Sequence, residues 1–152
     1  MFQGRFIHTI DNKGRLSIPA DFRMALQGKS KSKSKAPTLT VQPDCLALYP
    51  AEDWGRIKQN LEDAPAIDPN AQSLKRFLMS NAHTCPIDGP GRISVPPHLR
   101  EYAGLEREVT VAGVGSHIEL WNKARYDEEI SKVRSNFNEL SSLVARGQSS
   151  SV

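Results

Sequence analysis

Two short stretches of the chain, far apart in the sequence, alternate between polar and apolar residues. Residues 15–18 read Arg-Leu-Ser-Ile, and residues 92–95 read Arg-Ile-Ser-Val. A period of two puts the apolar side chains on one face of a strand, so each stretch predicts a half-buried strand. A proline follows each stretch, Pro19 and Pro96, and predicts the end of the strand and the first turn of a short helix.

The same kind of pattern predicts four more strands and three more helices. The strands are expected over residues 38–42, 45–49, 108–112 and 117–121. Two helices are expected on either side of the helix-breaking segment 64–69, because apolar residues recur there at helical spacing: Trp54, Ile57 and Leu61, then Leu74, Phe77 and Leu78. A third helix carries a stripe of Tyr126, Ile130, Val133, Phe137, Leu140 and Val144. The stripe covers less than three heptads, so we expect it to pack on its own domain or on a neighbouring subunit.

The two alternating strands belong to an internal repeat. Residues 11–23 read DNKGRLSIPADFR and residues 88–100 read DGPGRISVPPHLR, which agree at a constant offset of 77. After a change of length, Leu39-Thr40-Val41 resembles Val109-Thr110-Val111, and residues 46–49 resemble 118–121. Such agreement predicts two copies of one strand-rich unit that cannot close a core alone. We divide the chain into a first copy (1–54), connecting helices (55–80), a second copy (81–124), a C-terminal helix (125–146) and a disordered tail (147–152).

Basic residues are concentrated near the N-terminus. The chain has a formal net charge of +3 at pH 7. Residues 1–35 hold eight Lys and Arg against two Asp, a net charge of +6, so the remainder carries −3. This asymmetry indicates a face for a polyanion such as nucleic acid. Four of the lysines alternate with other residues in the loop 28–36, which is either a solvated segment or a nonspecific clamp on phosphates.

Several classes of protein are disfavoured. No apolar run approaches the roughly 20 residues of a membrane span, and the N-terminus lacks a secretory apolar core, so we expect a cytoplasmic protein with no membrane partner. Cys45 and Cys85 lie outside any CxxC pair, which favours two buried thiols over a disulfide or a zinc site. The spacing of His8, His83, His98 and His117 matches no metal pattern, and neither a nucleophile elbow nor a phosphate-binding glycine loop is present. We therefore predict no enzyme, metal, cofactor or small-molecule substrate.

The turn before each alternating strand has Asp, Gly and Arg at the same positions. Asp11 can accept backbone N–H bonds, and Gly14 can adopt a positive φ. The arginine that follows, Arg15 or Arg92, can pair with O6 and N7 of guanine in the major groove through its planar guanidinium. The alternative is that Asp11–Arg15 and Asp88–Arg92 are ion pairs that staple the turns. The residues alone leave both interpretations open.

The repeated motif resembles a known DNA-binding signature. DNKGRLSIPADFR is similar to the signature of the AbrB-type swapped-hairpin fold. Two copies in a chain of this length, an MFxG opening and a CLxLYP segment over residues 45–50 resemble the MraZ family along nearly the whole chain. This resemblance implies an α+β fold, a tandem pseudo-twofold swapped-hairpin (AbrB-like) β-barrel with peripheral helices. The two copies would exchange hairpins within one chain.

The resemblance also implies a function. MraZ proteins are cytoplasmic, nucleoid-associated regulators that bind repeated short boxes upstream of the division and cell-wall gene cluster, chiefly repress it, and assemble into rings. We accordingly expect a sequence-specific transcriptional repressor that binds guanine-containing boxes in double-stranded promoter DNA as a homo-oligomeric, octamer-like ring. The alternative is a swapped-hairpin protein-interaction module of antitoxin type, in which DNA binding is secondary.

The candidate residues fall into two roles. The predicted DNA contacts are Arg15, Lys13, Gly14, Arg92 and Arg5, with Lys13 and Arg5 on the phosphate backbone. The predicted structural residues of the turns and strand ends are Asp11, Asp88, Gly91, Pro19, Pro96, Arg23 and Arg100, and internal pairing is favoured over phosphate contact for the last two. The second copy departs from the first in two ways: it has Gly89-Pro90 in place of Asn12-Lys13, and it lacks a counterpart of the loop 28–36.

Overall fold

The computed structural model describes residues 1–27 and 36–149. Of the predicted basic loop, residues 28–35 lie outside this description, as do residues 150–152 of the predicted tail. The part of the tail that is described, residues 147–149, is helical, so the expectation of disorder from residue 147 is wrong there.

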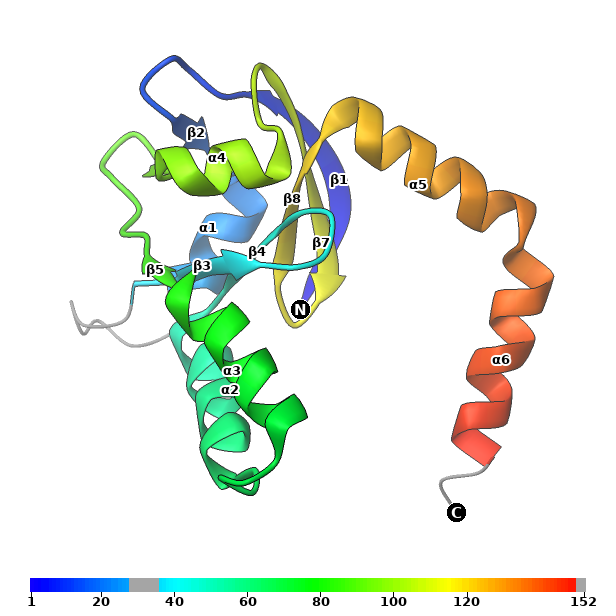
Figure 1. The fold of residues 1–152 in the computed structure, drawn as a ribbon. Helices are drawn as coiled ribbons and strands as arrows, with labels where there is room; N and C mark the ends of the chain where they lie inside the picture. Colours follow the sequence, from blue (N-terminus) through cyan, green and yellow to red (C-terminus); the bar gives the residue numbers. More distant parts are fainter. Residues whose placement is uncertain (28–35, 150–152) are drawn as a thin grey trace.

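The first copy of the repeat forms four strands and one short helix. They are β1 (Phe2–Thr9), β2 (Arg15–Ser17), α1 (Ala20–Gln27), β3 (Thr38–Val41) and β4 (Leu46–Tyr49). Two helices follow, α2 (Ala51–Asp63) and α3 (Pro69–Ser80), separated at the predicted break (Figure 1). Asp68 caps α3 by accepting from the backbone N–H of Asn70 at 2.9 Å, and an ion pair of 2.6 Å between Glu62 and Lys75 links the two helices.

The second copy repeats this order of elements. It comprises β5 (His83–Thr84), β6 (Arg92–Ser94), α4 (Pro97–Ala103), β7 (Glu108–Gly115) and β8 (Ile118–Asn122). Gly104 ends α4 in the left-handed region with a φ of 65°, a conformation that glycine adopts without steric cost. Two further helices, α5 (Lys123–Ser135) and α6 (Phe137–Ser149), complete the described chain.

The two copies share their sheets. Six strands form one antiparallel sheet in the order β1-β7-β8-β4-β3-β5, and β2 pairs with β6 in a separate two-stranded ribbon. The first strand of each copy, β1 or β5, therefore pairs with β7 or β3 of the other copy. The fold is a mixed α+β structure in which strands of one copy find their hydrogen-bonding partners in the other.

The strand register corrects one part of the sequence alignment. Leu39 pairs with Leu48 in β3–β4, and Val111 pairs with Leu120 in β7–β8. Because Leu48 and Leu120 are equivalent in the repeat, Leu39 is equivalent to Val111 and not to Val109, as the sequence comparison indicated. A slip of two residues keeps every side chain on its own face of a strand, so the apolar pattern could not exclude it.

One hydrophobic core contains residues of both copies. The equivalent residues Leu16 and Ile93 are 0% and 1% exposed, and Leu46 and Ile118 are both fully buried. Burying a side chain of this size contributes about 1.5–3 kcal/mol. Each copy thus supplies part of the surface on which the other packs, which explains why the repeat occurs twice in one chain.

The predicted C-terminal helix over 125–146 is two helices and not one. Asn136 lies between α5 and α6 with a φ of −114°. Its side-chain Nδ2 donates to the carbonyl of Lys132 at 3.2 Å, and the hydroxyl of Ser135 donates to the carbonyl of Ser131 at 3.1 Å. Side chains that bond to carbonyls one turn back compete with the backbone ladder and bend helices, which accounts for the break.

The apolar stripe divides at this break. Tyr126 of α5 packs edge-on against Trp121 of β8, with ring centroids 5.8 Å apart. In contrast, α6 extends away from the sheets (Figure 1) and leaves Phe137 and Val144 each 64% exposed. Within the described ranges, no helix combines the length and apolar character needed to cross a membrane.

Candidate nucleic-acid interface

The β2–β6 ribbon brings the two repeated motifs together. Arg15 pairs with Ser94 and Ser17 pairs with Arg92, on either side of the central pair Leu16–Ile93. Since Leu16 and Ile93 are buried in the core, the alternation of a strand puts the other four side chains on the outer face. The sequence predicted one arginine turn in each copy, and the structure places both arginines on one face of one ribbon.

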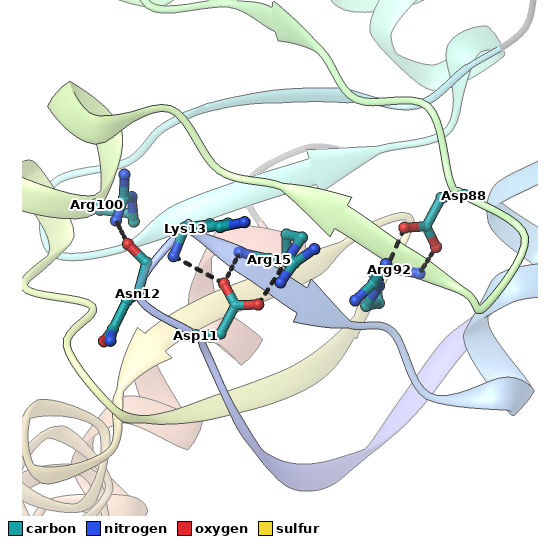
Figure 2. A network of polar contacts seen from close by, with 7 residues as sticks. All are labelled: Asp11, Asn12, Lys13, Arg15, Asp88, Arg92 and Arg100. Carbon is teal, nitrogen blue, oxygen red and sulfur yellow. Dashed lines mark hydrogen bonds and ion pairs between the residues drawn. The ribbon is translucent and has the colours of Figure 1, made fainter.

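The first turn is built around the carboxylate of Asp11 (Figure 2). Its Oδ1 accepts from the backbone N–H of Lys13 at 3.0 Å and of Arg15 at 2.9 Å. Its Oδ2 accepts from Nε of Arg15 at 2.7 Å. One carboxylate therefore closes the turn and fixes the base of the arginine fork.

The second turn has the same plan with one contact fewer. Asp88 accepts from the backbone N–H of Arg92 at 2.7 Å and from Nε of Arg92 at 3.1 Å. Pro90 occupies the position of Lys13 and has no N–H to donate. The second turn therefore lacks both the backbone hydrogen bond that Lys13 makes to its aspartate and the positive charge of Lys13.

Both aspartates remain ionised near neutral pH. The hydrogen bond from the backbone N–H of Arg15 lowers the pKa of Asp11 below its ordinary value, and the corresponding bond from Arg92 lowers the pKa of Asp88. Each arginine uses its Nε for this pair while its side chain remains about one-third exposed, 37% for Arg15 and 34% for Arg92. In the described part of the chain, no hydrogen-bond partner occupies the two Nη atoms of either arginine.

The predicted ion pairs are thus present, and each of them uses only the Nε of its arginine. A guanidinium has five N–H donors, and pairing through Nε leaves the four donors on the two Nη atoms at the outer end. This end is the planar fork that recognises a carboxylate, a phosphate or a guanine edge. The structural role of the pair and a recognition role of the arginine are therefore compatible.

The two turn glycines occupy a conformation that other residues avoid. Gly14 has a φ of 80° and Gly91 a φ of 91°, as the motif predicted. Each also faces an arginine of the other copy: a Cβ on Gly14 would lie 2.7 Å from Nε of Arg100, and a Cβ on Gly91 would overlap the guanidinium of Arg23. Arg23 and Arg100 therefore pack across the repeat, each against the turn of the opposite copy.

Sequence reasoning missed a pair of equivalent contacts behind the ribbon. Nδ1 of His8 lies 2.6 Å from the carbonyl oxygen of Ser17, and the thiol of Cys85 donates to the carbonyl of Ser94 at 3.6 Å. His8 and Cys85 are separated by the repeat offset of 77, so two different side chains hold the same point of the ribbon. The offset was the available signal, but the chemistry of the two residues is too different to suggest a shared role.

The remaining predicted residues are distributed as follows. Lys13 is exposed at the tip of the first turn, and Pro19 and Pro96 follow the ends of β2 and β6. Arg5 lies elsewhere, on β1, with its Cζ 5.7 Å from the centroid of the Tyr126 ring in a cation–π contact. It is therefore not part of the outer face of the ribbon.

Both cysteines are buried and free, as expected. Burial raises the pKa of the Cys85 thiol to about 12, so it stays protonated at neutral pH. Among residues 1–27 and 36–149, no cluster of His, Cys, Asp and Glu has the arrangement of a metal site.

Comparison with known proteins agrees with this division into two motifs. The model of the MraZ protein family, described as antitoxin-like, matches residues 1–77 and again residues 78–147. The chain belongs to the MraZ family. Each match of the MraZ model contains one copy of the Asp-Gly-Arg turn. The boundary between the two matches, at residue 78, therefore separates the two motifs whose strands pair in the ribbon.

Named MraZ relatives match most of the chain. The chain is 44% identical to the transcriptional regulator MraZ of Thermomicrobium roseum, over 80% of its own length and 82% of the relative. It is 42% identical to the protein of the same name from Moorella thermoacetica, over 84% and 85% of the two chains. With the MraZ transcriptional regulator of Syntrophobacter fumaroxidans the identity is 35%, over 95% and 94%.

Proposed function

We propose that this protein is a transcriptional regulator that binds double-stranded DNA in a sequence-specific manner through the outer face of the β2–β6 ribbon. The observation that carries the proposal is that Arg15 and Arg92 share this face, each with its Nε held by an aspartate and its outer fork unpaired among the residues that the structure describes. The names of the relatives support a regulatory role. We propose further that the protein represses transcription of the division and cell-wall gene cluster.

A two-stranded ribbon has the right dimensions for the major groove. The groove of B-DNA is about 12 Å wide and admits a two-stranded β-ribbon. Arg15 and Arg92 are diagonal neighbours on the ribbon, which places their side chains about 7–8 Å apart at the base. Since base pairs are stacked about 3.4 Å apart, the two forks would reach guanines roughly two steps apart.

The two copies would contribute unequally. Lys13 adds a cation beside Arg15 that can contact a phosphate, whereas the second turn has Pro90 at this position. A good bidentate contact discriminates between bases by about 1–3 kcal/mol, so the two arginines of one chain give little discrimination between DNA sequences. Several chains joined in a ring would gain affinity from simultaneous binding to regularly repeated boxes.

The strand exchange supports the swapped-hairpin barrel as the architecture behind the ribbon. The ribbon is closed by two equivalent bonds, from the N–H of Ile18 to the carbonyl of Gly91 (2.9 Å) and from the N–H of Val95 to the carbonyl of Gly14 (2.8 Å). The two bonds are equivalent, because Ile18 corresponds to Val95 and Gly91 corresponds to Gly14 in the repeat. We call residues 11–15 and 88–92 the first and second reading turns. In this architecture each reading turn depends on both copies.

A titration of DNA from upstream of the protein's own gene tests the proposal. Arg15→Ala should abolish the specific gel shift, and Arg92→Ala should weaken it less, because the second turn lacks the accompanying lysine. Melting temperature should change little in both variants, since exposed ion pairs contribute only about 0–1 kcal/mol. Unaltered DNA affinity in Arg15→Ala would contradict the proposal.

The antitoxin-type alternative has one observation in its favour, the description of the family as antitoxin-like. It predicts that the main binding partner is a protein and that Arg15→Ala leaves this binding intact. The same variant therefore separates the two functions.

A further inference from the structure

Arg100 connects the second copy to the first reading turn directly and through Val95. Its Nη1 donates to the carbonyl of Asn12 at 3.5 Å, within the turn itself (Figure 2). Its Nε donates to the carbonyl of Val95 at 3.1 Å. Val95 in turn donates its backbone N–H to the carbonyl of Gly14 at 2.8 Å, so the arginine holds the turn both directly and through one residue of the ribbon.

The equivalent arginine of the first copy does not hold the second turn in this way. Arg23 lies against Gly91, but its Nε is buried and has no hydrogen-bond partner in the described part of the protein. Ile18 still donates to the carbonyl of Gly91 at 2.9 Å, so the ribbon bond is present and only the arginine bonds differ.

The sequences of the two turns explain the difference. The second turn contains Gly89-Pro90, and the proline ring fixes one φ angle of the turn without any external contact. The first turn has Asn12-Lys13, which are both exposed and have no such restraint. A residue that reduces the freedom of the turn before binding also reduces the entropy lost on binding.

We propose that Arg100 is a positioning residue that holds the first reading turn, Asp11 to Arg15, in its binding conformation from the opposite copy. This inference rests on the proposed DNA-binding function. Arg100 acts on the turn through the Asn12 carbonyl and through Val95, and it does not itself contact DNA. The first turn carries both Lys13 and Arg15, so the copy with more recognition groups is the one that requires the brace.

The test measures amide hydrogen exchange of the turn in the free protein and then the affinity of the protein for promoter DNA. In Arg100→Lys the charge remains but the planar donor pair is lost. Amide hydrogen exchange at Gly14 and Arg15 should become about tenfold faster in the free protein, the effect of losing hydrogen bonds from a charged donor. Affinity for the promoter DNA should fall by about the same factor with an unchanged salt dependence. Arg23→Lys is the matched control and should leave exchange at Gly91 and Arg92 unchanged.

A second set of variants tests whether the sequences of the two turns explain why only the first depends on its arginine. The double substitution Asn12→Gly and Lys13→Pro gives the first turn the sequence of the second. In this background Arg100→Lys should no longer change the exchange at Gly14 and Arg15. An equal acceleration in both backgrounds would overturn the inference.

Two other outcomes would also overturn it. If Arg100 contacted a phosphate, Arg100→Lys would keep its affinity, and Arg100→Gln would reduce the salt slope by about 0.9. Loss of the folded state in Arg100→Lys would show a role in general stability instead. A parent protein that fails to bind promoter DNA would refute the proposed function, while the exchange measurement would still report whether the turn is braced.

Discussion

At the scale of single residues, Asp11 has two functions that can be separated. Its Oδ1 closes the turn by accepting two backbone N–H bonds, and its Oδ2 orients Arg15. An asparagine can keep the first function, because its carbonyl oxygen accepts the same bonds, but its amide group cannot accept from the arginine.

We therefore predict that Asp11→Asn retains the melting temperature of the parent and weakens promoter binding, though less than Arg15→Ala does. Gel shifts and thermal melts of both variants measure this. Because the folded-state pKa of Asp11 is lowered, its contribution to the turn is complete above the ordinary pKa and is lost only as the pH falls through the lowered value. Binding that varies with pH between 6 and 8 in the parent, and not in Asp11→Asn, would contradict this assignment.

Much of the site could be predicted at this scale. The Asp-Gly-Arg motif specified the turn, its positive-φ glycine and the aspartate bonds, because all of these are local in sequence. The positions of Arg23 and Arg100 against the opposite glycines could not be predicted, because they depend on how the two copies pack. The same holds for Arg5, whose contact with Tyr126 comes from the placement of α5 on the sheet.

At the scale of elements, a half-buried cluster joins His117 of the β7–β8 turn to Gln42 and Tyr49 of the β3–β4 hairpin. The ring of His117 stacks on Tyr49 with centroids 4.4 Å apart, and its Nε2 lies 3.5 Å from Nε2 of Gln42. Burial lowers the pKa of His117, against the opposing influence of Glu119 and Asp53. Because Gln42 offers a donor at this distance, the neutral imidazole with an accepting Nε2 fits the site.

This cluster predicts a pH dependence of stability. The unfolded chain takes up a proton at His117 near its ordinary pKa, about 6.5, whereas the folded chain does so only at a lower pH. The free energy of unfolding should therefore fall as the pH is lowered from about 7 toward the folded-state pKa. Urea titrations from pH 7.5 to 5 measure it.

The matched variants for this measurement differ in burial. His117→Phe keeps a ring against Tyr49 and should flatten the dependence, whereas His98→Gln changes an exposed residue of α4 and should leave it in place. A stability curve of unchanged slope in His117→Phe would show that the titrating group lies elsewhere.

The limits of prediction at this scale come from the periods of the elements themselves. Alternation identified the strands of the ribbon and sheet except β1 and the two-residue β5, which is too short to show a period. It could not fix the register of β3 relative to β7, since a two-residue shift leaves the faces unchanged. The helical period ran through Asn136 without interruption, because the break arises from side-chain bonds to carbonyls and not from the apolar spacing.

At the scale of the whole molecule, α6 leaves an apolar surface uncovered. Phe137, Leu140, Leu143 and Val144 are 64%, 41%, 52% and 64% exposed, and α6 stands apart from the rest of the chain (Figure 1). Exposed apolar groups that recur on one helix face mark a contact surface. In the proposed ring, this surface would pack against a neighbouring chain.

Leu140→Asp should therefore reduce the oligomer to smaller species, as measured by light scattering after size exclusion. Ser142→Asp introduces the same charge on the opposite side of α6 and should leave the mass unchanged. Affinity for repeated boxes should fall in Leu140→Asp toward the affinity for a single box, because linkage between chains is lost. A full-size assembly in Leu140→Asp would place the contact between chains elsewhere.

The position of the ribbon on bound DNA can be measured directly. A DNA-cleaving iron chelate can be tethered to Ser17→Cys on the outer face of the ribbon, since both native cysteines are buried and will not react. If the ribbon binds the promoter boxes, Ser17→Cys should cut within them, and the same reagent on Ser73→Cys, an exposed position of α3, should not. Cuts from α3 with none from the ribbon, on DNA that is still bound, would contradict this binding mode.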